Sequence, residues 1–319
     1  MSNQLTATAT GCSGLIGITV SDSYTAPTSS AVIQCTSSSL DVGDAVSVSL
    51  GFNGSNNRVF AGYVKNVQRS QQPTLYEITC ANAMIRAVDF FIVSDSPLTP
   101  YSRSSIKAET LVGQLMAMAG LTNFSGGSTS FTFATAGTPL EVNLTSVYDF
   151  CKMIADLLAW HIFADDNGKV WFKSRPPFPD GDSSVASFGS STLLNASFWR
   201  SDRDLRNRIV VYGSEGIQAE AKAASPYLPG GFYKSVLVAA PTLITTQGMA
   251  DQTASFNLAK LNRLTIGGSL TTFGNSSVAC RDCVDVSMSA IGMTGQFFVY
   301  GIEHSWSKDG YTTTMDLRS

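Results

Sequence analysis

The residues that could bind a metal or a phosphate are few in this sequence, and none of them completes a motif. Cys280 and Cys283 form a single Cys-x-x-Cys pair. Structural zinc needs a second such pair or suitably spaced histidines, and neither follows. The segment GCSGLIG at residues 11–17 contains three glycines, but no strand precedes it and no helix follows. We interpret it as a flexible lead-in rather than a phosphate-binding loop, and we predict no metal and no cofactor.

Carboxylates and histidines that could catalyse a reaction also have simpler interpretations. Asp165 and Asp166 precede an Asn-Gly hairpin turn, which explains them better than a glycosidase carboxylate pair does. The chain has two histidines, and neither accompanies the nucleophile motif of a catalytic triad. His161 lies in an aromatic strand, where a packed ring is expected. His304 is interpreted as a polar residue closing a strand at a subunit boundary, so His304→Asn should leave the fold intact. We predict that the protein is not an enzyme.

Charges of both signs gather in RSDRDLRNR at residues 200–208. Such a cluster is typical of a solvated loop or of a salt-bridge network between subunits, and the sequence leaves both open. The candidate subunit-interface residues are Arg200, Asp202, Arg203, Asp204, Arg206 and His304.

Composition narrows the class of protein. Charged residues make up 14% of the 319 residues, and the abundance of Ser, Thr, Gly and Asn is typical of a β-rich chain with many turns. A net charge of −3 gives no basic footprint for nucleic acid. The sequence shows neither a long apolar run nor a signal peptide, so we expect no membrane segment. Six scattered cysteines are expected to be reduced and mostly buried.

Apolar and polar residues alternate from residue 40 to residue 83, which predicts an antiparallel meander opened by a tight turn at LDVGD. A helix is expected after a cap at Ser104 or Ser105, ending at Gly120. A second helix should begin with a capping box of Ser146 and Asp149.

The strands 160–163 and 169–173 are expected to form a hairpin, followed by a linker at 176–184. The sequence then predicts a strand from Ile209, a long exposed loop over 217–231, a helix capped by Asp251, and closing strands. The predicted domains are 1–95, 96–200 and 201–319.

The last strands look like a second copy of the first ones. Val46-Ser-Val48 matches Val284-Asp-Val286, and the next strand starts thirteen residues later in each copy. In an ungapped alignment His304 falls on Asn66, or on Lys65 after a shift of one residue. Duplication and chance resemblance between alternating strands both remain open.

These segments together resemble the baseplate hub proteins of contractile phage tails, a family that includes the late control protein D type and the hub part of type VI secretion spikes. The resemblance rests on LDVGDAVSV, IKAETLVGQLMAMAGL, SVYDFCKMIADLLAWHIFADDNGKVWFK, RNRIVVYG and FFVYGIEHSWSKDGYTTTMDLRS. It implies a mainly β fold in which two tube-like antiparallel β-barrel domains flank a small α+β insert. It also implies a homotrimer whose barrels form a pseudo-hexameric ring between the six-fold tail tube and the three-fold central spike.

The partners that the resemblance implies are the tail tube protein and the central spike protein, with the tape measure protein and the baseplate wedge as further candidates. The location it implies is the virion tail baseplate, assembled in the bacterial cytoplasm. The chain ends soon after its last predicted strand, so no fused lysozyme, peptidase or spike is expected.

Two alternatives remain. One is a tail-tip hub of a non-contractile tail. The other is a tail-associated cell-wall hydrolase or carbohydrate-binding protein, in which Trp199, Tyr227 and Phe232 would stack on sugars.

Overall fold

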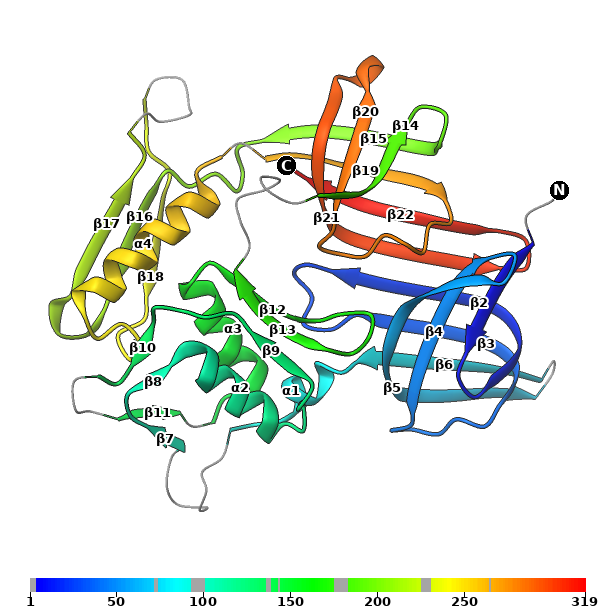
Figure 1. Cartoon of the computed structure of the whole chain (residues 1–319), viewed down its shortest axis with the longest axis horizontal. Coiled ribbons are helices and arrows are strands. Elements are labelled where there is room, and N and C mark those ends of the chain that lie inside the picture. Colours follow the sequence, from blue (N-terminus) through cyan, green and yellow to red (C-terminus); the bar gives the residue numbers. More distant parts are fainter. Residues whose placement is uncertain are drawn as a thin grey trace.

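A computed structural model describes residues 4–71, 74–92, 101–135, 139–142, 144–174, 183–224, 231–263 and 265–319. The expected β-rich fold with a small helical part is confirmed. The largest element is a 12-stranded sheet that contains strands from both ends of the chain. Figure 1 shows the N-terminal strands in blue and cyan beside the C-terminal strands in orange and red.

The first part of this sheet, the first β unit, is built from the N-terminal strands. Its inward residues form a separate apolar core, and Ile33, Val48, Leu50 and Ile78 are fully buried. The segment 11–17, expected to be a flexible lead-in, instead turns at Gly11 (φ 71°) and enters a strand. The strands are β1 (Leu5–Ala9), β2 (Cys12–Ser23), β3 (Ser30–Ser38), β4 (Ala45–Phe52), β5 (Ser55–Gln71) and β6 (Thr74–Asn82).

The second β unit has its own core, with Val284, Val299, Met315 and Leu317 at its centre. Its strands are β14 (Ser184–Gly189), β15 (Leu193–Ser201), β19 (Thr265–Phe273), β20 (Cys283–Met288), β21 (Met293–Ser307) and β22 (Tyr311–Arg318). The two units are not separate sheets, because β2 pairs with β21 and makes the backbone pairing continuous.

The two units repeat one topology. The strand order is β4-β5-β6-β3-β2 in the first unit and β20-β21-β22-β19-β15 in the second, so successive strands match in chain order. Both copies carry β-bulges at matching places. The extra residue is Lys65 in β5 and Tyr300 in β21, and it is Ile16 in β2 and Leu194 in β15. Shared bulges at shared positions are specific features, which favours duplication over chance resemblance.

The turn that opens the meander is repeated as well. In the first copy Gly43 N–H donates to the Val64 carbonyl at 2.9 Å, and in the second copy Arg281 N–H donates to the Val299 carbonyl at 2.8 Å. Asp44 and Asp282 each use Oδ2 to accept a backbone N–H three residues upstream, both at 2.8 Å. LDVGD therefore corresponds to VACRD, although the two segments share only their final aspartate.

The bulges correct the register of the sequence alignment. Val46 does match Val284, but Val46 pairs with Gly62, sixteen residues on, whereas Val284 pairs with Phe297, thirteen residues on. The first hairpin is thus three residues longer. His304 consequently corresponds to Arg69, and the predicted match to Asn66 or Lys65 is wrong.

An α+β unit follows β6. A shared apolar core holds α2 (Ala108–Met118) and α3 (Val147–Leu157), with Leu111, Leu115 and Ile154 fully buried. The predicted cap at Ser146 is confirmed, because its Oγ accepts from the Asp149 N–H at 3.0 Å, while the Asp149 carboxylate accepts from the same hydroxyl at 2.7 Å. The other elements are α1 (Ile85–Asp89), β7 (Tyr101–Arg103), β8 (Ile106–Lys107), β9 (Phe124–Gly126), β10 (Thr132–Phe133), β11 (Leu140–Val142), β12 (Trp160–Ala164) and β13 (Val170–Ser174).

The first predicted helix cap is wrong. Helix α2 begins at Ala108, because the residues before it pair as β8 with β10. The predicted hairpin is confirmed, and Gly168 (φ 76°) sits in its turn. The predicted linker at 176–184 lies almost wholly outside the described residues.

A second α+β segment lies between β15 and β19, where the first repeat has only a short turn. It comprises β16 (Arg208–Tyr212), β17 (Gln218–Lys222), β18 (Ser235–Ala239), α4 (Gln247–Leu261) and the 3₁₀ turn η1 (Ser214–Gly216). The predicted loop is wrong over 218–222, which is a strand. The predicted Asp251 cap is also wrong, since Thr246 Oγ1 accepts from the Met249 N–H at 3.3 Å and Asp251 lies one turn inside the helix.

The apolar cores do not follow the predicted domain ranges 96–200 and 201–319. Strands β14 and β15 pair with the C-terminal strands. Ile209, Val211 and Ala250 belong to the core of the α+β unit. None of the helices in the described part of the chain is long and apolar enough to span a membrane.

Candidate functional site

The junction between the two β units is where the chain shows how its repeats associate. Strand β2 lies antiparallel to β21, with Gly17 opposite Ser307 and Ser23 opposite Gly301. Just beyond β2, the Tyr24 N–H donates to the Tyr300 carbonyl at 2.8 Å, and the two rings stack with centroids 4.9 Å apart. Association of the repeats therefore proceeds by strand addition.

A buried ion pair stabilises this junction. Arg281 Nη1 lies 2.8 Å from Asp22 Oδ2, and both side chains are about nine-tenths buried, each with 11% exposure. Arg281 adopts φ 78° at the place where the first repeat has Gly43. A left-handed conformation is costly for a side chain other than glycine, so the contact to Asp22 must offset that strain.

His304 lies inside the same junction, opposite Val20 of β2. Only 3% of its surface is exposed, and its Nδ1 lies 3.1 Å from Thr313 Oγ1 and 3.0 Å from the Tyr311 hydroxyl. Burial lowers the pKa of His304 to about 4. Because its ring is enclosed within one chain, His304 lies at a boundary between repeats, which corrects the expected place at a subunit boundary.

Two aromatic residues of the second repeat complete the core of the first. Trp306 and Tyr311 belong to strands of the second β unit, but they are buried among the apolar residues of the first β unit. Trp306 lies opposite Ile18 of β2. The two β units are thus joined by apolar packing as well as by backbone pairing.

The α+β unit contacts this junction through its hairpin. His161 Nε2 lies 3.0 Å from the Tyr24 hydroxyl, so the expectation of a packed histidine with a bonded nitrogen is confirmed. Burial, together with Asp22 and other nearby carboxylates, raises the pKa of Asp166 to about 7. Asp165 behaves as the turn residue that was predicted, since its Oδ1 accepts the N–H groups of Asn167 and Lys169, both at 2.9 Å.

The Cys-x-x-Cys pair is part of the repeated turn and of β20. Cys280 and Cys283 are buried as free thiols, and they stand where the first repeat has Val42 and Ala45. Burial raises the pKa of Cys280. The spacing of the two cysteines therefore follows from the duplicated turn and strand.

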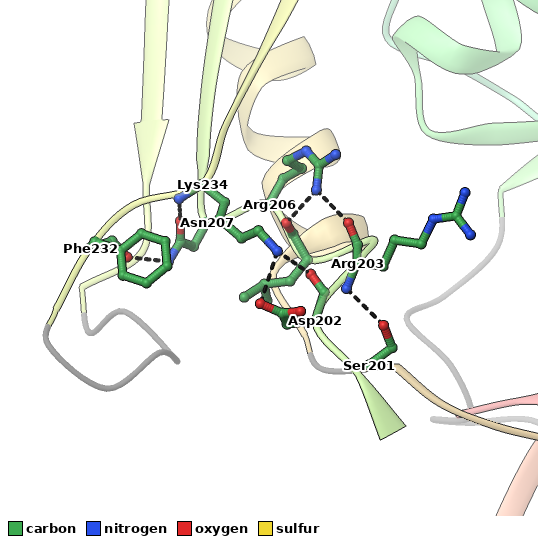
Figure 2. A network of polar contacts seen from close by, with 8 residues as sticks. Ser201, Asp202, Arg203, Arg206, Asn207, Phe232 and Lys234 are labelled. Carbon is green, nitrogen blue, oxygen red and sulfur yellow. Dashed lines mark hydrogen bonds and ion pairs between the residues drawn. The ribbon is translucent and has the colours of Figure 1, made fainter. Parts of the chain in front are cut away.

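The charged cluster at 200–206 turns the chain from β15 into β16 (Figure 2). Lys234 Nζ lies 2.9 Å from Asp202 Oδ2, and this contact lowers the pKa of Asp202. Arg206 Nη1 donates to the carbonyls of Arg203 and Leu205 at 2.8 and 2.7 Å. Asp202 and Arg206 therefore hold the turn together within the chain.

The remaining predicted interface residues are open to solvent. Arg200, Arg203 and Asp204 are exposed, and Figure 2 shows the Arg203 side chain pointing away from the network. Arg200 lies in β15, which pairs with β19 alone among the described strands. Of the aromatic residues considered for sugar stacking, Trp199 (39% exposed) and Phe232 (55%) are accessible, while Tyr227 lies outside the described residues.

Comparison with known proteins supports this fold by structure alone. No family profile matches the sequence, and no characterised protein matches it by sequence comparison. A tail protein from Neisseria meningitidis MC58 superposes with a TM-score of 0.70 at 12% identity, over 99% of this chain and 97% of that one. The 43 kDa tail protein of prophage MuSo2 from Shewanella oneidensis gives 0.67 at 13% identity, over 99% and 98%.

A component of the type VI secretion system, the Escherichia coli c3393 protein, gives a TM-score of 0.58 at 11% identity, over 98% of this chain and 76% of that one. That protein is described as structurally similar to the bacteriophage T4 tail proteins gp27 and gp5. The chain therefore has the fold of phage tail proteins and of a related secretion component.

Proposed function

We propose that this protein is the baseplate hub of a contractile phage or phage-like tail, a homotrimer that adapts the six-fold tail tube to the three-fold central spike. The single observation that carries the proposal is the internal repeat. Two copies of one strand topology, joined edge to edge, let three chains present six similar β units. The likeness in fold to phage tail proteins over nearly the whole chain supports it.

The work of such a hub is mechanical, with no chemical step. Side chains that could serve catalysis are instead used in structure: His304 and His161 are buried with hydroxyl partners, and Asp165 is bonded in a turn. The partners we propose are the tail tube protein and the spike protein, with tape measure and baseplate wedge as further neighbours, in the virion tail assembled in the bacterial cytoplasm.

Native mass spectrometry of the full chain tests this function, with the chain alone and co-expressed with the candidate spike protein of the same tail gene cluster. The expected result is a homotrimer that holds one trimeric spike. A chain that stays monomeric both alone and with the spike would contradict the proposal. Sheath and wedge genes beside this one would favour the contractile tail over a non-contractile tip.

A further inference from the structure

The internal repeat indicates how two strand edges that are unpaired in the single chain could be paired. Inside the chain, β2 of the first repeat pairs with β21 of the second, and the counterparts of these strands are β15 and β5. The bulges and cross-strand pairs fix the equivalence residue by residue. Val20 corresponds to Phe198, and His304 corresponds to Arg69.

Both counterpart edges are unpaired in the described part of the chain. Strand β15 is the last strand of the sheet and pairs with β19 alone. Strand β5 pairs with β4 through residues 55–63, and from Asn66 to Gln71 it pairs only with β6. Figure 1 shows β15 and β5 in different parts of the molecule, so one chain does not bring these edges together.

We infer that β15 of one subunit pairs antiparallel with β5 of a second copy of this chain, in the register that β2 and β21 show inside the chain. Ala196 then lies opposite Gln71, and Ser201 lies opposite Asn66. This inference rests on the proposed trimer and specifies its contact. Repetition of the same junction alternately within and between chains closes a ring of β units.

The side chains along these edges suit a contact that forms after folding. Unpaired strand edges attract other strands, and charged residues on them limit indiscriminate pairing. Arg69 and Arg200 are exposed on the two edges. Each edge is thereby protected from random strand addition, while its backbone donors and acceptors remain free for the matched partner.

Cysteine cross-linking of the full chain tests the register. Of the six cysteines, all within the described residues, five are buried and Cys12 is half-buried, so Cys12→Ser provides the background. One double variant combines Ser70→Cys with Ser197→Cys, and the other combines Val67→Cys with Arg200→Cys. Neighbouring positions alternate between hydrogen-bonded and non-hydrogen-bonded pairs, so the two variants sample both geometries. The matched controls exchange partners, Ser70→Cys with Arg200→Cys and Val67→Cys with Ser197→Cys.

The expected result after mild oxidation is that at least one matched variant shifts from the monomer band to covalent dimers and trimers on a non-reducing gel. The exchanged controls should stay monomeric on that gel, because their cysteines lie three residues, about 10 Å, out of register, beyond the reach of a disulfide. A native trimer that cross-links in neither matched variant, or equally in the controls, would overturn the pairing but leave the proposed function standing. A chain that is monomeric alone and with its spike would overturn both.

Discussion

The internal junction and the two open edges lie at equivalent places in the repeats but carry different side chains. Inside the chain the β2–β21 junction is locked by the buried Asp22–Arg281 pair and by Trp306. At the open edges the corresponding positions are Arg200, Gly43 and Gln71, which provide neither an ion pair nor apolar packing of this kind. The difference indicates that the internal contact forms with the fold, whereas the proposed external contact would depend on a second subunit.

The largest effect is expected from emptying the apolar part of the internal junction. Trp306→Ala should lower the free energy of unfolding by about 3–5 kcal/mol, because it leaves a cavity in the core of the first β unit. The equivalent change in the first repeat, Gln71→Ala, removes an exposed side chain and should stay within about 0.5 kcal/mol in the monomer. Urea denaturation of both variants measures this contrast, and equal losses would contradict it.

The ion pair should have the next largest effect. Asp22→Ala leaves the buried Arg281 guanidinium without its carboxylate partner and should cost about 3 kcal/mol. Arg281→Gly leaves the equally buried Asp22 carboxylate unpaired instead, but it relieves the backbone at φ 78°, so its loss should be about 1 kcal/mol smaller. Thermal unfolding of the two variants gives the order, and a larger loss for Arg281→Gly would show that the strain is not relieved.

His304 makes the internal junction sensitive to pH. The folded pKa of about 4 lies below the usual 6.5, so the unfolded chain binds the proton first as pH falls. The contribution of the neutral His304 ring to the free energy of unfolding is complete above pH 6.5. It is lost as pH falls from 6.5 through 4, to a limit of about 3 kcal/mol. Asp166, whose folded pKa of about 7 lies above the usual 3.8, changes stability in the opposite direction over the same range. The His304 effect is therefore the difference between the wild type and a variant without the imidazole, measured by chemical denaturation between pH 7 and 4.

His304→Asn is the matched control for that effect. The variant should fold, as the sequence predicted, and should gain stability relative to the wild type as pH falls from 7 to 4, because it lacks the imidazole that takes up a proton in the unfolded chain. An unchanged slope in the variant would assign the effect elsewhere.

The smallest effect is expected from introducing an ion pair at the open edges. Gly43→Arg with Arg200→Asp places an arginine and an aspartate at the counterparts of Arg281 and Asp22, on the two sides of the proposed subunit contact. The backbone at Gly43 already has φ 93° and open space around it. A new pair near the surface should add up to about 1 kcal/mol per contact, or about five-fold in affinity. Dissociation of the trimer at low concentration, followed by analytical ultracentrifugation, measures this change in affinity. Arg200→Asp alone should not strengthen the trimer.

Much of the local structure could be predicted from the sequence, because it depends on near neighbours. Alternation predicts the first meander, and local motifs predict the helix cap at Ser146 and the Asn-Gly turn that the structure shows. Strand β17 was missed because its inward residues, Ala219 and Ala221, are too small to give a strong apolar pattern.

The junction itself could not be predicted from the sequence. The three-residue difference between the hairpins shifted the alignment and placed His304 on the wrong counterpart. Arg281 takes the place of a turn glycine, which hid the repeated turn, and its partner Asp22 is 259 residues away in the chain. A signal was present in the shared final aspartate of LDVGD and VACRD, but one matching residue is too little to recognise without the hydrogen bonds.

Hydrogen–deuterium exchange of the monomer and the assembled protein tests the central claim that internal and external junctions are equivalent. In the monomer, the facing amides of 17–23 and 301–307 should be protected, while those of 66–71 and 196–201 exchange quickly on their free edges. In the trimer all four segments should be protected. A trimer in which 66–71 and 196–201 still exchange as in the monomer would contradict the account.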